Sequence, residues 1–158
     1  MAASGMSVCL TRAGRVAFVV NVEVLLERDG RWLLIRRGAG EDHAAGALAG
    51  VGGKVEGHGA GVDVLEETAR REVAEEIGVD VSGVALRYVE SAFFVTDDGD
   101  PVINVVFRGE LPADAEPVAA SVYEVAGFAW YTAAEAGADP ACPPWIARGL
   151  RRAAASAG

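Results

Sequence analysis

Apolar and polar positions along the chain predict several short strands arranged around one long helix. Residues 16–27 are rich in valine and leucine and indicate a buried strand, and residues 32–36 form a second apolar run. The Arg-Asp-Gly-Arg segment at residues 28–31 has the residue types of a hairpin turn. The chain is therefore predicted to open its fold with a β-hairpin.

The clearest helix is predicted over residues 63–78. Ala69, Val73 and Ile77 recur every four residues, which gives the helix one buried stripe. We expect Asp63 at the N-cap, with Glu66 completing a pair that resembles a capping box. Gly78 is expected just beyond the last turn, where a left-handed backbone is common.

Three more segments indicate strands. Residues 84–96 and 102–111 are β-rich, and the DDGDP sequence between them predicts a second hairpin. Residues 127–131 predict a short strand. Thr132 with Glu135 then predicts a capping box for a brief helix, and residues 145–155 fit a C-terminal helix.

Residues 38–62 contain nine glycines, a density that predicts a long loop with unusual backbone angles. Long loops of this kind usually serve a site. The order of elements predicts an α/β (α+β) fold with a mixed β-sheet sandwiched between helices. We expect residues 1–14 to form a flexible N-terminal tail and residues 15–158 to form a single domain.

Composition limits the partners that the protein can attract. The chain has 14 Lys and Arg against 23 Asp and Glu, a formal charge of -9, which argues against a nucleic-acid polymer or an anionic membrane. The longest apolar run is interrupted by Asn21 and Glu23 and is too short to span a bilayer. Cys9 and Cys142 have no neighbouring Cys or His and are expected as reduced thiols. A cytoplasmic location is the default expectation, since no secretory signal is visible.

Three glutamates gather on one edge of the predicted helix. Glu72, Glu75 and Glu76 share an arc of roughly 100° beside the buried stripe. Like charges at this spacing cost about 0.2–0.5 kcal/mol per pair, so the arrangement needs an explanation. A divalent cation such as Mg²⁺ supplies one, because it prefers oxygen ligands and leaves room for phosphate oxygens. The alternative is a solvated acidic helix face.

The sequence around these glutamates resembles the Nudix hydrolase family. The family's box runs G-x5-E-x7-R-E-U-x-E-E-x-G-U, where U is a bulky aliphatic residue, and REVAEEIGV at residues 71–79 matches its second half without exception. GGKVE at residues 52–56, preceded by ALAGV, looks like the stretch that begins the box. The resemblance, which covers residues 16–155, implies a Nudix-like α/β/α sandwich and a hydrolase that uses Mg²⁺, with Mn²⁺ as the alternative metal.

The spacing departs from the family pattern in one place. About four extra residues lie between Glu56 and Val64, so residues 57–62 form a glycine-rich insertion within the box. Asp63 is then either a shortened equivalent of the family's first Glu or a helix N-cap, and we favour the N-cap. The insertion would change the shape of a pocket without disturbing the acidic helix.

The resemblance also implies roles for individual residues. The expected metal ligands are Glu72, Glu75, Glu76, the backbone carbonyl of Gly52, and Glu124; the expected catalytic residues are Glu72, Glu75, Glu76, Arg71 and Glu124; the expected substrate-binding residues are Arg37, Lys54, Gly53, His43 and Trp145. Arg71 would orient neighbouring carboxylates. Arg37 and Lys54 would contact phosphate, although a solvated strand end explains Arg37 equally well.

The carboxylate from outside the box is expected to be a metal ligand or the general base. Glu124 is the first candidate because it lies six residues before Trp130. The acidic residues of the DDGDP turn are weaker candidates, since turn chemistry already explains them, and Glu90 is weaker still.

Residues that would recognise a base are less well defined. Trp145 and His43 could approach a base, but an aromatic residue at the start of an amphipathic helix is more often part of the core. Asn21 and Glu23 alternate on one strand face and either line the floor of the pocket or face solvent.

The leading prediction is a metal-dependent pyrophosphohydrolase that cleaves the diphosphate link of a nucleoside diphosphate derivative, with (d)NTP or oxidised (d)NTP to NMP as the best guess. Its partner would be a small-molecule nucleotide, and a homodimer is left open. The alternatives are a non-catalytic nucleotide-binding or regulatory module on the same fold, a Nudix hydrolase specific for ADP-ribose or another nucleotide sugar, and a structural acidic protein with incidental Ca²⁺ binding. The intact set of Glu72, Glu75 and Glu76 favours the enzyme over a pure binder.

Overall fold

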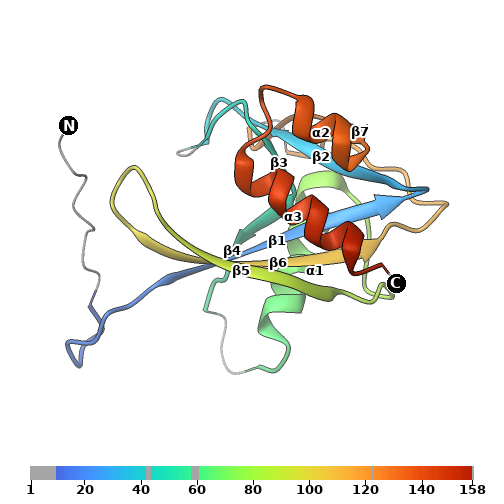
Figure 1. The fold of residues 1–158 in the computed structure, drawn as a ribbon. Coiled ribbons are helices and arrows are strands. Elements are labelled where there is room, and N and C mark those ends of the chain that lie inside the picture. The colour runs from blue at the N-terminus through green and yellow to red at the C-terminus, as the bar shows by residue number, and fades with distance from the viewer. Residues whose placement is uncertain (1–9, 42–43, 58–60, 122, 158) are drawn as a thin grey trace.

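The computed structural model describes residues 10–41, 44–57, 61–121 and 123–157 (Figure 1). Its seven-stranded sheet has the order β3-β2-β1-β6-β5, with β4 paired to β1 and β7 paired to β2. The strands are β1 (Val19–Arg28), β2 (Arg31–Arg37), β3 (Leu48–Ala49), β4 (Val51–Lys54), β5 (Arg87–Val95), β6 (Pro101–Glu110) and β7 (Val125–Tyr131). The helices are α1 (Val64–Ile77), α2 (Ala133–Ala138) and α3 (Pro144–Ala155).

The sheet is mixed, as predicted. β1 runs antiparallel to β2 and β4 and parallel to β6, and β6 pairs with β5 as an antiparallel hairpin. The turn between β1 and β2 places Asp29 and Gly30 at φ angles of 53° and 76°. Two successive positive φ angles suit the twist of a tight hairpin, so the sequence prediction for this turn is confirmed.

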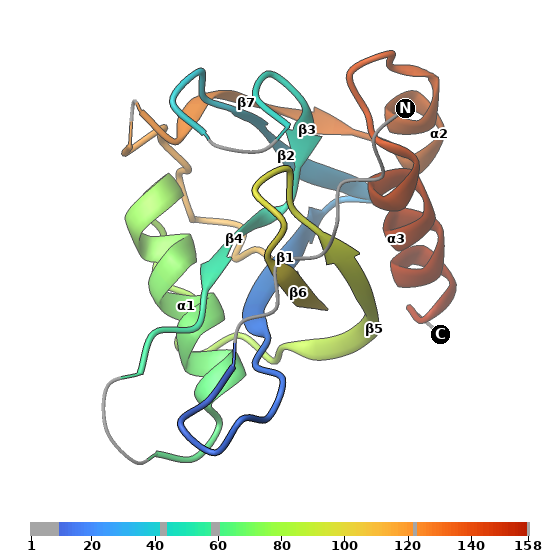
Figure 2. The same ribbon diagram turned by 90° about the vertical axis from the view of Figure 1, so that its left-hand side faces the viewer.

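Helices cover both faces of the sheet (Figure 2). α1 packs on one face through the predicted stripe of Ala69, Val73 and Ile77, each with 0% exposure. α2 and α3 pack on the other face, where Ile146 and Leu150 lie in a second buried cluster. The predicted α/β/α sandwich is therefore confirmed, and successive residues of β1 point alternately into the two layers.

The ends of α1 follow the prediction only in part. Gly78 is left-handed, with a φ of 67°, and its N–H donates to the carbonyl of Ala74. Asp63 occupies the N-cap, but its φ of 53° is also left-handed and its side chain forms no capping hydrogen bond. The expected capping box with Glu66 is therefore wrong, because a cap side chain reaches the first turn from an extended backbone. The capping box of α2, formed by Thr132 and Glu135, is confirmed.

The prediction of a loop throughout residues 38–62 was wrong for residues 48–49 and 51–54, which form β3 and β4. The glycines there allow close strand contact. A Cβ at Gly50 would lie 2.7 Å from the carbonyl oxygen of Val24, and a Cβ at Gly52 would meet the carbonyl oxygen of Val22. Glycines are frequent in this segment because its backbone lies close to the backbone of β1. The loop interpretation did not consider this use of glycine.

Two smaller observations complete the fold. Cys142 is a free thiol, whereas Cys9 and the first nine residues of the predicted tail lie outside the described part of the chain. None of the described helices combines the length and apolar character that crossing a lipid bilayer requires.

Candidate active site

The acidic edge of α1 faces the glycine-rich strand β4. Glu76 is buried, with 6% exposure, and its Oε2 accepts a hydrogen bond from the N–H of Gly52 at 3.3 Å. The carboxyl group of Glu72 lies so close to Gly53 that a Cβ on this glycine would meet it. Glu75 is exposed. Two of the three predicted glutamates are therefore held between the helix and the Gly-Gly pair.

Arg71 ties the helix to the end of β4. One guanidinium nitrogen donates to Glu72 Oε1 at 2.9 Å and to the carbonyl oxygen of Lys54 at 3.3 Å. Another nitrogen donates to Glu56 Oε2 at 3.3 Å. One side chain therefore joins the Glu72 carboxylate to the end of β4 through charge-assisted hydrogen bonds.

The carboxyl groups of the acidic site raise one another's pKa values. Burial raises the pKa of Glu72 to about 7, Arg71 opposes the rise, and Glu75 and Glu124 add to it. Burial likewise raises the pKa of Glu76 to about 8, against the opposing hydrogen bond from Gly52, with Glu72 and Glu124 adding to the rise. Carboxylates that raise one another's pKa share a region of negative potential, which attracts cations.

Glu124 reaches this region from another part of the chain. It lies just before β7, it is exposed, and its negative charge raises the pKa of both Glu72 and Glu76. Its backbone carbonyl accepts a hydrogen bond from Gly38 N–H at 2.8 Å, which joins its segment to the end of β2. The fold therefore brings the first candidate from outside the box toward the acidic helix.

The other acidic candidates lie elsewhere. Asp97, Asp98 and Asp100 belong to the turn between β5 and β6. Glu90 is 4% exposed and accepts three hydrogen bonds from Arg148 of α3. Its carboxylate is therefore used to join α3 to β5.

The donor chemistry of the acidic site fits a divalent cation, because carboxylates and a peptide carbonyl are the oxygen ligands that Mg²⁺ prefers. Glu72 and Glu76 face the Gly52-Gly53 strand, where a close backbone leaves no side chain between them and the peptide. Within the described part of the chain, no three His, Cys, Asp or Glu side chains are already gathered around one point. The residues therefore have the donor chemistry of a Mg²⁺ site without forming a finished coordination shell.

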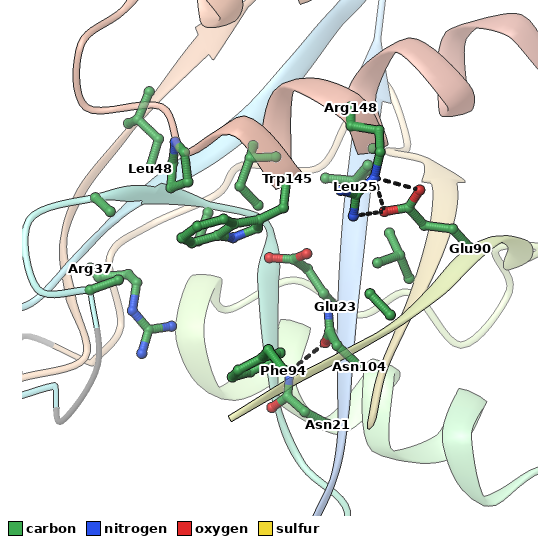
Figure 3. Close-up of a pocket in the computed structure, with 18 of the residues that line it drawn as sticks. Asn21, Glu23, Leu25, Arg37, Leu48, Glu90, Phe94, Asn104, Trp145 and Arg148 are labelled. Carbon is green, nitrogen blue, oxygen red and sulfur yellow. Dashed lines mark hydrogen bonds and ion pairs between the residues drawn. The ribbon is translucent and has the colours of Figure 1, made fainter. Parts of the chain in front are cut away.

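A cavity of about 440 Å³ opens on the α3 side of the sheet (Figure 3). Arg37 and Trp145, both predicted to bind substrate, line it, as do Asn21 and Glu23 of β1. Trp145 is 46% exposed, so its indole is not a core side chain. Arg37 also forms an ion pair with Glu41 at 2.8 Å. The volume lies within the range of small-molecule sites, about 300–1,000 Å³.

Two predicted substrate contacts lie outside this cavity. Lys54 is exposed at the end of β4, where its carbonyl accepts from Arg71. Gly53 lies against Glu72 in the acidic site. His43 falls outside the residues that the structure describes.

Sequence reasoning missed other residues that line the cavity or support the acidic site, among them Asn104, Phe94 and Glu56. Asn104 interrupts an apolar strand, which was a usable signal. Its importance depends on the parallel pairing of β6 with β1, which brings it opposite Asn21. Such a long-range pairing leaves no local trace in the sequence.

Fold and site together define a hydrolase that acts on pyrophosphate bonds. The NUDIX domain family model matches residues 17–152, so the chain belongs to the Nudix family. The fold is similar to a MutT NUDIX hydrolase from Burkholderia pseudomallei, with a TM-score of 0.71, 20% identity, and coverage of 86% of this chain and 98% of that one. It is also similar to a MutT protein from Methanosarcina mazei Go1, with a TM-score of 0.70, 23% identity, and coverage of 89% and 96%.

A third similar structure is an Ap4A hydrolase binary complex from C. elegans, with a TM-score of 0.69 and 16% identity. The alignment covers 87% of this chain and 97% of that chain. None of the curated proteins compared with the chain matches it. The family assignment therefore rests on the domain match, and the solved structures show the shared fold.

The metal-free protein is expected to lose stability as the pH rises from about 5 to about 8. Glu72 and Glu76 have folded-state pKa values of about 7 and about 8 against an ordinary 4.5, so the folded state holds protons that the unfolded state has released. Unfolding then releases protons, and the free energy of unfolding falls with rising pH. Below about 4.5 both states are protonated and this contribution is fully present.

Urea denaturation at several pH values with EDTA measures this effect, and Glu76→Gln should flatten the profile between pH 5 and 8. Added Mg²⁺ should restore stability at pH 8, because a ligand that binds only the folded state stabilises it. A wild-type profile with the same slope as that of Glu76→Gln would contradict the expectation.

Proposed function

We propose that the protein is a Mg²⁺-dependent pyrophosphohydrolase of nucleoside triphosphates, oxidised ones included, that releases the nucleoside monophosphate. The observation that carries the proposal is the pair Glu72 and Glu76, desolvated and held against the Gly52-Gly53 strand. A buried and a half-buried carboxylate whose pKa values are both raised cost free energy unless a cation balances them. A small-molecule cavity on the neighbouring layer supports a nucleotide as the substrate.

The proposal assigns a role to each side chain of the acidic site. Glu72, Glu75, Glu76, Glu124 and the Gly52 carbonyl would hold Mg²⁺. When bound, this ion neutralises diphosphate charge and lowers the pKa of a coordinated water. Arg71 fixes the Glu72 carboxylate through its hydrogen bond of 2.9 Å.

Other residues would handle the proton and the substrate. If Glu124 does not bind the metal, it would be the general base, since its exposed carboxylate can accept a proton from water. Arg37 and Lys54 would neutralise phosphate oxygens, and Trp145 would stack on the base. Among the similar structures, two have names that mention Ap4A and dihydroneopterin triphosphate, both of them phosphate anhydrides of nucleotide-like compounds. A cytoplasmic location and a homodimer stay predictions from the sequence.

The test is hydrolysis of a substrate panel with Mg²⁺, with Mn²⁺, and with EDTA. The panel contains the ribo- and deoxyribonucleoside triphosphates, 8-oxo-dGTP, ADP-ribose and Ap4A, and both products are identified by chromatography. We expect a nucleoside triphosphate to be the best substrate, to yield NMP and pyrophosphate, and to need the metal.

Other outcomes select the alternatives. A best rate on ADP-ribose would replace triphosphates with a nucleotide sugar as the substrate. Tight nucleotide binding without turnover of any compound would favour the non-catalytic module. Release of inorganic phosphate with NDP would show that the enzyme cleaves a different phosphate anhydride bond from the one proposed.

A further inference from the structure

The cavity on the α3 side contains a polar group that the proposed chemistry does not use. Glu23 lies on β1 between Val22 and Val24, which point into the α1 layer, so its own side chain points the other way. Its Oε2 accepts a hydrogen bond from the N–H of Gly50 at 3.2 Å. A carboxylate in a largely apolar cavity is costly to keep, which calls for a reason.

Two asparagines fix the floor of this cavity beside Glu23. Because β1 and β6 are parallel and in register, Asn21 and Asn104 lie opposite one another, and Asn21 Nδ2 donates to Asn104 Oδ1 at 2.7 Å. Burial raises the pKa of Glu23, and hydrogen bonds from the Gly50 N–H and from the Asn104 side chain oppose the rise. A carboxyl group has about four lone-pair positions, so two donors leave acceptor capacity facing the cavity.

Aromatic rings border the same space. Trp145 comes from the start of α3 and Phe94 from β5, and in Figure 3 their rings lie on two sides of the cavity with the Glu23 carboxyl between them in this view. Arg148, one turn after Trp145, holds α3 to β5 through its bonds to Glu90. Flat rings held by the fold suit a planar aromatic ligand, which can stack on them.

The cavity and the acidic site share one pair of strands. Glu23 pairs with Gly52 across β1 and β4, and the N–H of Gly52 is the group that holds Glu76. Arg37, which also lines the cavity, comes from the end of β2. A base in the cavity would therefore lie on the other side of the β1-β4 pair from the acidic helix, with Arg37 in the lining of the cavity to contact the phosphates.

We propose that Glu23 determines the base specificity of this hydrolase by accepting a hydrogen bond from an exocyclic amino group, so that cytosine, adenine or guanine is preferred over uracil or hypoxanthine. The inference rests on the proposed function. An amino group finds an acceptor oxygen on Glu23 whether the carboxyl is ionised or neutral. The position of that amino group carries a keto oxygen in uracil, which finds a donor only on the neutral carboxyl, and only a hydrogen in hypoxanthine compared with guanine. Neither base replaces the amino donor, and the absence of a partner in a desolvated cavity is costly.

Matched nucleotide pairs test the proposal. We expect kcat/KM to favour CTP over UTP, or GTP over ITP, by about ten- to a hundredfold, the range of one hydrogen bond to a charged group. Glu23→Leu should reduce this preference to below about threefold by slowing only the amino-bearing substrate. Glu23→Gln keeps an acceptor oxygen and should retain part of the preference. Glu110→Leu, an exposed glutamate at the end of β6, is the control and should leave the preference unchanged.

A second measurement separates this inference from the proposed function. Quenching of Trp145 fluorescence by CMP against UMP, and by GMP against IMP, needs neither metal nor turnover, and Trp145→Phe identifies the signal. Preferential binding of CMP or GMP that Glu23→Leu abolishes would support the inference even if no triphosphate is hydrolysed. Equal use of both members of each pair by the wild type, or an equal loss on both members in Glu23→Leu, would overturn it.

Discussion

Glu76→Gln is expected to lower kcat by about a thousandfold, as is typical when a group that stabilises transition-state charge is removed. Glu76 is 6% exposed and accepts a hydrogen bond from Gly52. The amide has the same shape and keeps an acceptor for that bond, so the fold should be preserved. It carries no negative charge, however, and can no longer help to hold a divalent cation.

Initial-rate measurements over a range of Mg²⁺ concentrations check this expectation. Glu67→Gln is the matched control, because Glu67 lies on the first turn of the same helix, is exposed, and is outside the site. The control should retain wild-type kcat. If Glu76→Gln kept more than a tenth of the wild-type kcat at saturating metal, Glu76 could not be a principal metal ligand.

Gly52→Ala is expected to destabilise the fold by about 3 kcal/mol, at the upper end of the usual cost of overpacking. The added Cβ would meet the carbonyl oxygen of Val22 and lie 2.9 Å from Glu23 Cα. Both are backbone atoms of β1, which cannot rotate away as a side chain would. Relief requires β4 to move from β1, and this would also displace the N–H that holds Glu76.

Urea unfolding followed by circular dichroism measures the change. Gly127→Ala serves as the comparison, because Gly127 is also a strand glycine and a Cβ there would have no neighbour within 4 Å. It should change the free energy of unfolding by less than about 1 kcal/mol. Equal midpoints for the two variants would show that β4 can shift at little cost.

Local patterns in the sequence were enough to predict most of the fold. The stripe of Ala69, Val73 and Ile77 predicted α1, and the Asp-Gly turn predicted the first hairpin, because both depend on neighbours close in the chain. β3 and β4 were missed because glycine has two uses that look alike in sequence. It permits loops, and it also permits strands to approach a neighbouring backbone, as Gly52 does.

For the candidate site as well, local sequence predicted one part and left another part unpredicted. The acidic edge of α1 followed from helical spacing, and the family resemblance added Arg71 and Gly52. The cavity depends on contacts between distant segments, so its full lining could not be derived. Asn104 is an example, since its place beside Glu23 depends on the parallel register of β6 with β1.

The alternation along β1 divides two tasks between the faces of one strand. Val22 and Val24 support the layer that carries the acidic helix, whereas Glu23 looks into the cavity. If Glu23 recognises the base, substitutions of Glu23 would change the preferred nucleotide and leave the acidic site unchanged. Such a division would allow related enzymes to evolve new substrate preferences through single substitutions, while the residues that cleave the phosphate anhydride stay the same.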